Sequence, residues 1–381
     1  MNVRPLRVAV LGAGPAGLYF TYRLKRARPD AAIEVFEQNP RGATFGFGLA
    51  FSGRALEFLR EQDEETYAAL VPALQSWSDS VIDLNGAEVR IDGMIYTGIG
   101  RLRLLEILEA QAASVGIEPQ YEHRIHSLDE LEGADVIVGA DGANSLVRRT
   151  RETAFGTSVD YLSNRYAWYG TRRWFDALCH TFIATEDGFF NAHHHAHADD
   201  MSTFVVEVDE PTFNRCGFET MSPEQARLKC EQVFERILAG SPLISNNSIW
   251  RRFPKIWNER WSVGNRVLIG DALHTAHFSI GSGTRLAMED AIALASALAA
   301  HSGDIPAALA SYEAARKPAV ATLTAAANNS AQWYENFAGH MSLEPLDFAM
   351  SYITRSGRVD LDRLRSKSPR FMAAYEERRR A

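Results

Sequence analysis

Short apolar runs alternate with amphipathic segments over the first 140 residues. The runs at 7–11 (RVAVL), 32–37 (AIEVFE) and 134–140 (ADVIVGA) are short and apolar, which predicts buried strands. The segment LYFTYRLKRA after the first run has helical spacing, and residues 54–60 and 101–114 also predict helices. The chain therefore opens on a strand, a helix and a second strand, which is the pattern of a βαβ unit.

Residues 160–260 follow a different pattern. The segments YAWYG, HTFIAT and STFVVEV are rich in aromatic and β-branched residues, which favours antiparallel strands. An amphipathic helix is predicted at 223–239 within this region. Residues 265–270 then predict another buried strand, and 285–300 and the alanine-rich segment 306–338 predict long helices. The pattern thus indicates an α/β region that a β-rich region interrupts.

The composition argues against several classes of protein. The net charge of −8 disfavours nucleic-acid binding, which needs clustered Lys and Arg. The cysteines Cys179, Cys216 and Cys230 have no CxxC spacing, and an odd number does not complete a disulfide framework, so we expect a reducing, cytoplasmic environment. No apolar stretch approaches the roughly 18 to 20 residues of a membrane helix. We therefore expect neither a nucleic acid nor a membrane as a partner.

A glycine-rich motif follows the first predicted strand and opens the first predicted helix. Its residues are Gly12, Ala13, Gly14, Pro15, Ala16 and Gly17. In such a motif the first glycine makes the turn, the second lets the backbone approach a pyrophosphate, and the third lets helix and strand pack closely. Glu37, at the end of the second strand, can accept a hydrogen bond from a ribose hydroxyl. The motif predicts dinucleotide binding without separating FAD from NAD; a glycine-rich turn with no ligand is the alternative.

Two further motifs follow predicted buried strands. The sequence DGANSLVR begins with Asp141 and Gly142, and a surface turn with a helix cap at Ser145 is its alternative interpretation. The sequence GDALH places Asp271 at the end of the strand NRVLIG. A glycine-rich helix start follows, with Gly281, Gly283 and Thr284. A carboxylate at a strand end can accept from a ligand hydroxyl, and backbone N–H groups at a helix start can meet a polar ligand edge.

In this order, the three motifs resemble the fingerprints of the flavoprotein monooxygenases typified by para-hydroxybenzoate hydroxylase. The resemblance covers most of the chain and implies that FAD is the tightly bound dinucleotide. It implies that Asp271 bonds the ribityl chain, that residues 281–284 lie against the isoalloxazine, and that Asp141 and Gly142 lie near the flavin. It also implies a contact between Arg101 and FAD, for which a solvated helix arginine is the alternative. We expect non-covalent FAD, because no His or Cys stands in a recognisable attachment context.

The same resemblance implies a hydroxylase of aromatic rings that uses NADH or NADPH and O2. In such enzymes a flavin C4a-hydroperoxide attacks an electron-rich ring. A phenol or aniline substrate can need a base, and the candidates are His277 and the cluster at 193–197, including His195. We expect no metal site, because these histidines lack zinc spacing; positions on a strand or loop near the substrate, or on the surface, are the other interpretations. A flavin reductase and a flavin-binding module without turnover are the alternative functions.

The segment HTAHFSIGSGTRLAMEDAIAL departs from the family pattern at Phe278 and Arg285, where Pro and Asn are usual. It resembles a subgroup that contains salicylyl-CoA 5-hydroxylase, anthraniloyl-CoA monooxygenases and the violacein-pathway hydroxylase of a tryptophan derivative. This implies an aryl-CoA thioester substrate, with an indolic or other aromatic biosynthetic intermediate, or a free aromatic acid or phenol, as alternatives. CoA phosphates need basic partners. Candidates are Arg172, Arg173, Arg251 and Arg252. Ordinary surface arginines are the other interpretation.

We therefore expect an α/β fold, with a Rossmann-like FAD-binding domain, an inserted β-sheet substrate domain and C-terminal helices. The expected boundaries are 1–75, 96–158 and 262–330 for the FAD-binding domain, 76–95 and 159–261 for the substrate domain, and 331–381 for the C-terminal helical segment.

Overall fold

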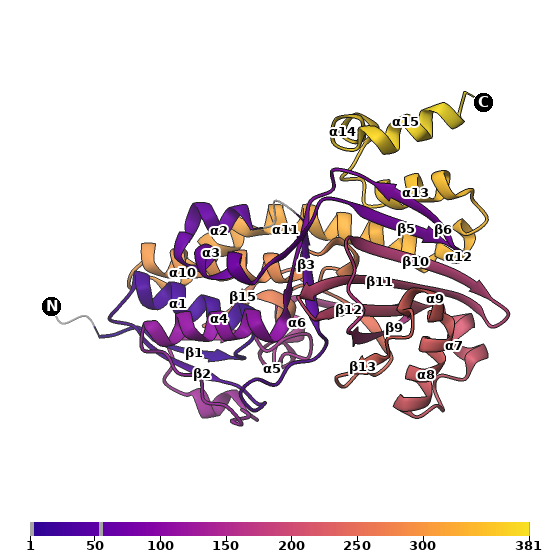
Figure 1. Ribbon diagram of the computed structural model, residues 1–381. Coiled ribbons are helices and arrows are strands. Elements are labelled where there is room, and N and C mark those ends of the chain that lie inside the picture. The colour runs from indigo at the N-terminus through magenta and orange to yellow at the C-terminus, as the bar shows by residue number, and fades with distance from the viewer. Residues whose placement is uncertain (1–3, 53–55, 381) are drawn as a thin grey trace.

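The computed structural model, which describes residues 4–52 and 56–380, has an α/β lobe and a β-rich lobe (Figure 1). The last helices lie over the β-rich lobe. This arrangement confirms the expected fold class, an α/β region with an inserted β-sheet region and C-terminal helices.

A mainly parallel sheet forms the centre of the α/β lobe. Its strands are β1 (Arg7–Leu11), β2 (Ala32–Phe36), β8 (Val136–Gly139), β15 (Ser262–Val263) and β16 (Arg266–Leu268). Their order is β15-β16-β8-β1-β2, with β15 antiparallel to β16 and the other neighbours parallel. The central strands β1 and β8 are buried on both faces, which explains their continuous apolar sequences. All four strands predicted for this region are confirmed.

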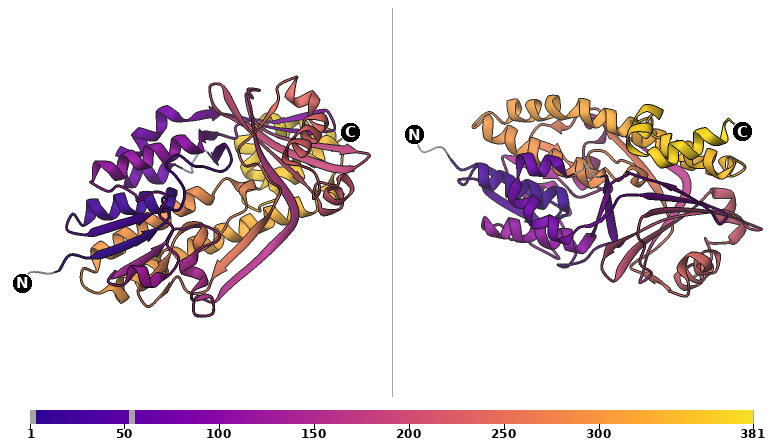
Figure 2. Two further views of the ribbon diagram at one scale, coloured as in Figure 1. Left: turned by 90° about the horizontal axis from the view of Figure 1, so that it is seen from below. Right: turned by 45° about the horizontal axis from the view of Figure 1, so that its top comes forward.

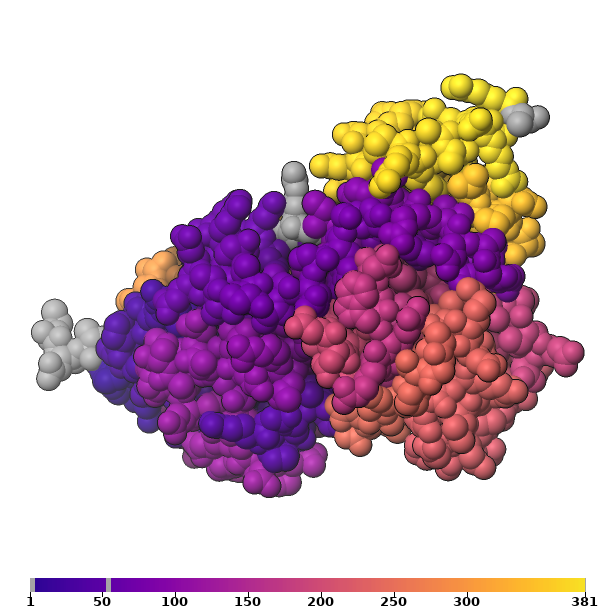
Figure 3. Space-filling model, viewed as in Figure 1, coloured from indigo at the N-terminus to yellow at the C-terminus, as the bar shows by residue number. Residues whose placement is uncertain are grey.

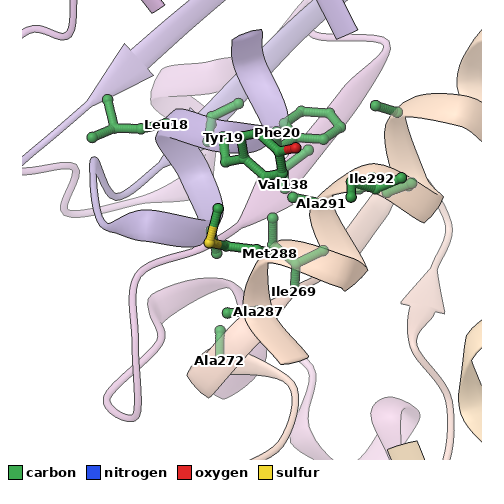
Figure 4. Packing of buried hydrophobic residues seen from close by; sticks show 14 of the residues in the cluster. Leu18, Tyr19, Phe20, Val138, Ile269, Ala272, Ala287, Met288, Ala291 and Ile292 are labelled. Carbon is green, nitrogen blue, oxygen red and sulfur yellow. The ribbon is translucent and has the colours of Figure 1, made fainter. Parts of the chain in front are cut away.

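Long helices cover this sheet. They are α1 (Pro15–Ala27), α4 (Arg101–Ser114), α10 (Gly283–Ala300) and α11 (Ile305–Glu335). Helix α1 packs against α4 and α10, and Figure 4 shows the ring of Phe20 on α1 near Ala291 and Ile292 of α10. Full burial of a Phe or Ile side chain stabilises the fold by about 1.5–3 kcal/mol. Helix α11 continues from this lobe to the β-rich lobe (Figure 2).

A large mixed sheet forms the β-rich lobe. Its strands are β5 (Ser80–Leu84), β6 (Ala87–Ile91), β9 (Thr157–Thr171), β10 (Leu178–Thr185), β11 (Gly188–Ala198), β12 (Met201–Val208), β13 (Leu243–Ser245) and β14 (Arg251–Asn258). The order is β13-β9-β12-β11-β10-β5-β6, and β14 also pairs with β9. The strands within residues 157–258 pair antiparallel, as the sequence predicts, whereas β5 runs parallel to β10.

A small sheet joins the two lobes. Its strands are β3 (Gly48–Ser52), β4 (Gln75–Trp77) and β7 (Tyr96–Gly100). Strand β7 lies between the other two, and it leads directly into α4. Strands β3 and β7 pack on β11 of the large sheet, and the backbone N–H of Gly48 donates to Thr203 Oγ1 at 2.8 Å. The start of α4 is therefore held beside the β-rich lobe.

Shorter helices complete the fold. They are α2 (Glu57–Gln62), α3 (Glu64–Leu70), α5 (Leu146–Arg149), α6 (Glu152–Phe155), α7 (Glu210–Cys216), α8 (Pro223–Val233), α9 (Glu235–Leu238), α12 (Phe337–His340), α13 (Pro345–Thr354), α14 (Leu361–Lys367) and α15 (Pro369–Arg378). The single helix predicted at 223–239 is divided at Phe234, whose buried ring packs edge-on against Phe190 and Phe204. Residues 54 and 55 of the helix predicted at 54–60 lie outside the described residues.

The C-terminal helices α13 and α15 pack on β5 and β6 of the large sheet (Figure 3). The Asp92 carboxylate, just after β6, accepts from the backbone N–H groups of Arg370 at 3.3 Å and Phe371 at 3.0 Å. These bonds satisfy donors at the first turn of α15, which have no partner within the helix. None of the helices in the described part of the chain is long and apolar enough to cross a membrane.

Candidate functional site

The larger of two adjoining cavities lies where the lobes meet, and the smaller lies within the α/β lobe. The larger has a volume of about 1060 Å³ and the smaller about 630 Å³. Both are lined by Gly14, Arg101 and Gly142, so together they form one long hollow. The smaller cavity extends to Glu37, and the larger extends to Thr284. A ligand that occupied both cavities would be long. Its middle part would lie beside Gly14, Arg101 and Gly142, the residues that line both cavities and that we call the shared wall, and it would be polar.

The glycines of the first motif line this hollow or support it. A Cβ atom on Gly12 would lie 2.4 Å from the carbonyl oxygen of Ala140, and one on Gly17 would lie 2.0 Å from that of Gly12. Both glycines are therefore required by the packing of the protein itself. A Cβ on Gly14 would meet nothing within 4 Å, although Gly14 lies on the wall of both cavities. The space in front of Gly14 fits the close approach of a pyrophosphate to the backbone.

Glu37 is fixed in place at the far end of the smaller cavity. Its Oε2 accepts from the backbone N–H of Ala13 at 2.9 Å, and its Oε1 accepts from the backbone N–H and side-chain amide of Asn39 at 2.9 and 2.7 Å. A carboxylate has about four acceptor positions, so one is left for a ribose hydroxyl. The helix start beside it begins with Pro15, whose missing N–H would have had no helical partner.

The second motif is both a helix cap and part of the wall. Ser145 Oγ accepts from the backbone N–H of Arg148 at 3.1 Å, so the helix cap is present. Asp141 Oδ2 accepts from the N–H of Leu146 at 2.6 Å, whereas its buried Oδ1 has no partner in the described residues. Burial raises the pKa of Asp141. The Arg148 guanidinium donates to the carbonyl of Ala272 at 2.9 Å and thereby ties this motif to the third.

Asp271 and Arg101 form a polar region on the wall of the larger cavity. The Asp271 side chain is open to the cavity and enclosed by protein on its other sides; this burial raises its pKa, and the Arg101 charge acts in the opposite direction. Arg101 is the first residue of α4, where the helix dipole disfavours a cation. An anionic or strongly polar ligand at the shared wall would stabilise that charge. Arg101 is thus a cavity residue and not a solvated helix arginine.

The start of α10 presents free donors to the larger cavity. Gly281 has a φ of 57°, and a Cβ there would lie 2.6 Å from the carbonyl oxygen of Ala50. The helix begins at Gly283, and the capping residue Ser282 makes no side-chain cap. The first N–H groups of the helix therefore have no intrahelical partner. With Thr284 on the same wall, they suit the polar edge of a flat ring system.

The histidines of β11 point alternately to the two faces of the large sheet. His193 and His195 face the larger cavity, whereas His194 packs on Phe204 on the other side of the sheet. Neither ring nitrogen of His195 has a hydrogen-bond partner within residues 4–52 and 56–380. Burial lowers the pKa of His193 to about 4 and that of His195 well below its usual value. These rings are neutral at pH 7, and a surface position is wrong for this part of β11.

The structure does not bring His277 to the same wall. Its buried Nδ1 lies 2.7 Å from Ser279 Oγ, and burial lowers its pKa to about 3. The adjacent Phe278 lines the cavity instead, with its ring 5.0 Å from that of Tyr166 and 5.7 Å from that of His193. The departure from the family pattern at Phe278 thus places an aromatic side chain on the cavity wall.

Two of the four arginines proposed for CoA phosphates line the larger cavity. These are Arg251 and Arg252. Arg172 and Arg173 do not line it, and the exposed Arg172 pairs with Asp200 at 3.0 Å. The sequence missed other wall residues, including His180 on β10 and Tyr352 and Arg355 from the C-terminal helices. They belong to no local motif, so only the three-dimensional fold brings them together.

The described residues contain no group of three or more His, Cys, Asp or Glu side chains that could hold a metal ion.

Comparison with known proteins places the chain among flavin-dependent hydroxylases. Residues 5–327 match the family described as FAD binding domain. The chain is 37% identical over 361 residues to salicyloyl-CoA 5-hydroxylase from Streptomyces sp, covering 92% of this chain and 70% of that protein. It is 36% identical over 330 residues to 3-hydroxy-4-methyl-anthranilyl-aryl-carrier-protein 5-monooxygenase from Streptosporangium sibiricum, covering 86% and 89%. It is 33% identical over 366 residues to protodeoxyviolaceinate monooxygenase from Chromobacterium violaceum, covering 92% and 94%.

Solved structures share the fold at low sequence identity. The structure of 2-methyl-3-hydroxypyridine-5-carboxylic acid oxygenase has a TM-score of 0.69 at 15% identity and covers 93% of this chain and 96% of that one. The structure of PqsL from P. aeruginosa in complex with 2-aminobenzoylacetate has a TM-score of 0.68 at 20% identity, covering 88% and 98%. Both extend over the two lobes, so the two lobes belong to one shared fold.

Proposed function

This chain belongs to the FAD-binding domain family, and from that premise we propose that it hydroxylates the ring of an aryl-CoA thioester of the salicylyl or anthraniloyl type. It is an FAD-dependent aromatic monooxygenase, and NADH or NADPH is the co-substrate typical of its family. The observation that carries the substrate proposal is the larger cavity, whose wall combines aromatic rings with several cations. An aromatic acyl group attached to an anionic carrier has this combination of chemistry.

The residues of the hollow fit FAD, and we propose roles for them on that basis. Gly14 leaves space for the pyrophosphate, and Glu37 keeps an acceptor for a ribose hydroxyl. Asp271 accepts from the ribityl chain, Arg101 contributes positive charge at the shared wall, and the helix start at 281–284 meets the ring edge. When bound, FAD takes a hydride from NAD(P)H and activates O2 for transfer to the ring.

The aromatic wall would hold the substrate ring and exclude water. Tyr166, Trp168 and Phe278 line the cavity beside His193 and His195. Because burial lowers the pKa values of both histidines, they are weak proton acceptors. We therefore assign to His195 a hydrogen bond from the phenol or amine of the substrate, which orients the ring, in place of full removal of a proton. His277 would act through Phe278, which packs on it at 4.2 Å between ring centroids.

A matched substrate panel tests the proposal. The holoenzyme would be given salicylyl-CoA and salicylate, anthraniloyl-CoA and anthranilate, and an indole carboxylate, with NAD(P)H oxidation, O2 uptake and product mass measured together. We expect a kcat/KM for the CoA esters at least about tenfold above that for the free acids, the effect of one charge-assisted contact. Equal efficiency for ester and acid would overturn the thioester proposal. NAD(P)H oxidation without a hydroxylated product from any compound would favour a reductase.

An indolic substrate is the second candidate. The observation in its favour is the 33% identity to protodeoxyviolaceinate monooxygenase over nearly the full length of both chains. In the same panel, hydroxylation of the indole carboxylate in preference to every CoA ester would put this candidate first.

A further inference from the structure

The basic side chains of the larger cavity are concentrated in an otherwise acidic protein. The protein carries a net charge of −8. The cavity is lined by the cations Arg101, Arg251, Arg252, Arg285, Arg355, Arg358, Arg363 and Lys367. Among the described lining residues, the carboxylates are those of Glu57 and Asp271. FAD brings a pyrophosphate to Gly14, but the cations of the C-terminal segment belong to a different part of the wall.

The C-terminal segment supplies four of these cations. Arg355 follows α13 and is oriented by the protein: its Nε donates to Ser330 Oγ at 2.9 Å and its guanidinium lies 3.7 Å from the ring centroid of Tyr352. Arg358, Arg363 and Lys367 also line the cavity and are exposed. We call these last three residues the basic rim.

The cations of the basic rim have no counter-ions of their own. In residues 4–52 and 56–380, no carboxylate forms an ion pair with Arg358, Arg363 or Lys367. By contrast, Arg285 on the same wall pairs with Glu289 at 2.8 Å, and Arg365 on the same helix pairs with Asp362 at 2.9 Å. Partial burial against the cavity wall and the charges of Arg285 and Arg363 lower the pKa of Arg358. Like charges held together without partners favour an anionic ligand.

The rim is also fixed to the fold. The backbone carbonyl of Lys367 packs so closely on Gly93 that a Cβ atom there would lie 1.8 Å from it. Asp360 caps α14 by accepting from the N–H of Arg363 at 2.8 Å. Gly93 and its neighbours Met94 and Ile95 line the same cavity as the rim and the aromatic wall. A ligand can therefore contact the aromatic wall and the basic rim within one cavity.

We propose that Arg358, Arg363 and Lys367 bind the phosphate groups at the nucleotide end of coenzyme A while the aryl group lies at the aromatic wall. This inference rests on the proposed function, because it identifies where the carrier of the aryl-CoA substrate is held. Guanidinium and ammonium groups bind phosphate through charge-assisted hydrogen bonds, and the exposed position of the rim leaves the nucleotide outside the closed part of the cavity. The pantetheine arm then passes Met94 and Ile95.

Binding of free CoA tests the rim without relying on turnover. The double variant Arg363→Ala/Lys367→Ala removes two exposed cations, and Arg365→Ala/Arg379→Ala removes two from the same segment that do not line the cavity. We expect the Kd of the FAD-loaded enzyme for CoA to rise at least about tenfold in the rim variant, with little change in the control variant. Equal Kd values for the two variants would overturn the rim assignment.

Truncated ligands identify the group that the rim contacts. Dephospho-CoA lacks the 3′-phosphate. The rim substitutions should therefore raise the Kd for dephospho-CoA less than they raise the Kd for CoA, and the difference measures the contact as in a double-mutant cycle. The KM for salicylyl-CoA relative to that for its N-acetylcysteamine thioester should rise at least about tenfold in the rim variant. The ratio of KM values for NADPH and NADH should not change. A rim variant that alters this coenzyme ratio and not CoA binding would assign the rim to NADPH and overturn the proposal.

The two proposals fail in different ways. If the wild-type enzyme hydroxylates free salicylate as well as salicylyl-CoA, the proposed function fails, whatever the Kd for CoA. If it prefers the CoA ester but the rim and control variants bind CoA equally, the function stands and the rim assignment fails. A wild-type enzyme that accepts only an aryl group on a carrier protein, and binds no free CoA, would also overturn the rim assignment.

Discussion

Glycine is required at Gly14 and Gly17 for two different reasons. At Gly17 the space for a Cβ atom is filled by the backbone of Gly12, so the protein itself excludes any side chain. At Gly14 the same space is open, and the backbone has a φ of −76°, which any residue can adopt. The packing of the protein itself therefore does not require glycine at this position. The reason we propose is the cofactor.

Valine substitutions separate these two reasons. Gly14→Val should fold with an apoprotein melting temperature close to that of the wild type and should be purified with little or no FAD, because the side chain occupies the place proposed for the pyrophosphate. Gly17→Val should lose the folded state, since a valine there meets backbone atoms that cannot move away. Flavin absorbance per mole of protein and thermal unfolding by circular dichroism measure the two effects. A yellow Gly14→Val protein with normal FAD affinity would contradict our assignment of the motif.

At the scale of elements, periodicity in the sequence predicted type and position well and pairing less well. Helix α4 has the bounds that its spacing predicts, because its buried apolar positions Leu104, Ile107, Leu108 and Ala112 recur at helical spacing. The pairing of β5 with β10 joins segments nearly 100 residues apart and runs parallel, which no local pattern can indicate. The break between α8 and α9 depends on the burial of Phe234 against strands of the large sheet.

The residues of the candidate site likewise fall into those that the sequence predicted and those that it did not. The motif residues that line the hollow could be named because each motif combines a turn, a strand end and a helix start within a few positions. His180 and Tyr352 could not be named, since each contributes one side chain from an element that carries no other signal. The basic rim was missed for a related reason: Arg358, Arg363 and Lys367 do not differ in sequence from the other basic residues of the same segment, and only their cavity position distinguishes them.

Helix α11 contains an internal proline that supports a further prediction. Pro318 is exposed and lies well inside the helix, where it lacks an N–H donor and its ring crowds the preceding turn. Pro318→Ala should stabilise the protein by about 2 kcal/mol, because the helix penalty of about 3 kcal/mol exceeds the entropy that proline removes from the unfolded chain. Thermal unfolding measures this. Pro369→Ala, at the first turn of α15, is the control and should give no gain; an equal gain there would refute the explanation.

At the scale of the whole molecule, the fold buries several histidines whose pKa is lowered by that burial. Burial lowers the pKa of His193 and His197 to about 4 and that of His194 and His277 to about 3. In the unfolded chain these rings titrate near pH 6.5. Below that pH the unfolded state binds protons that the folded state does not, so acid favours unfolding.

The free energy of unfolding should therefore fall as the pH decreases from 6.5 towards 4. Each such histidine contributes up to about 1.4 kcal/mol per pH unit. Glu207 acts in the opposite direction, because burial raises its pKa to about 8 and its folded form holds a proton that the unfolded form releases above about pH 4.5. Urea unfolding at saturating FAD between pH 6.5 and 5 measures the slope. His277→Asn should reduce the slope, and an unchanged slope in that variant would contradict a neutral buried His277.

The strand order of the parallel sheet also determines when the protein can first hold its cofactor during synthesis. Strand β16 is the partner of β8 on the side away from β1, yet it begins at Arg266, far beyond the other parallel strands. The wall residues Asp271 and Gly283 follow it. Because domains fold from the N-terminus as the chain leaves the ribosome, the GAGPAG turn is made early but has no opposite wall until most of the chain has emerged. We therefore expect the protein to bind FAD only late in its synthesis. A chain truncated before β16 should be released from the ribosome without bound FAD.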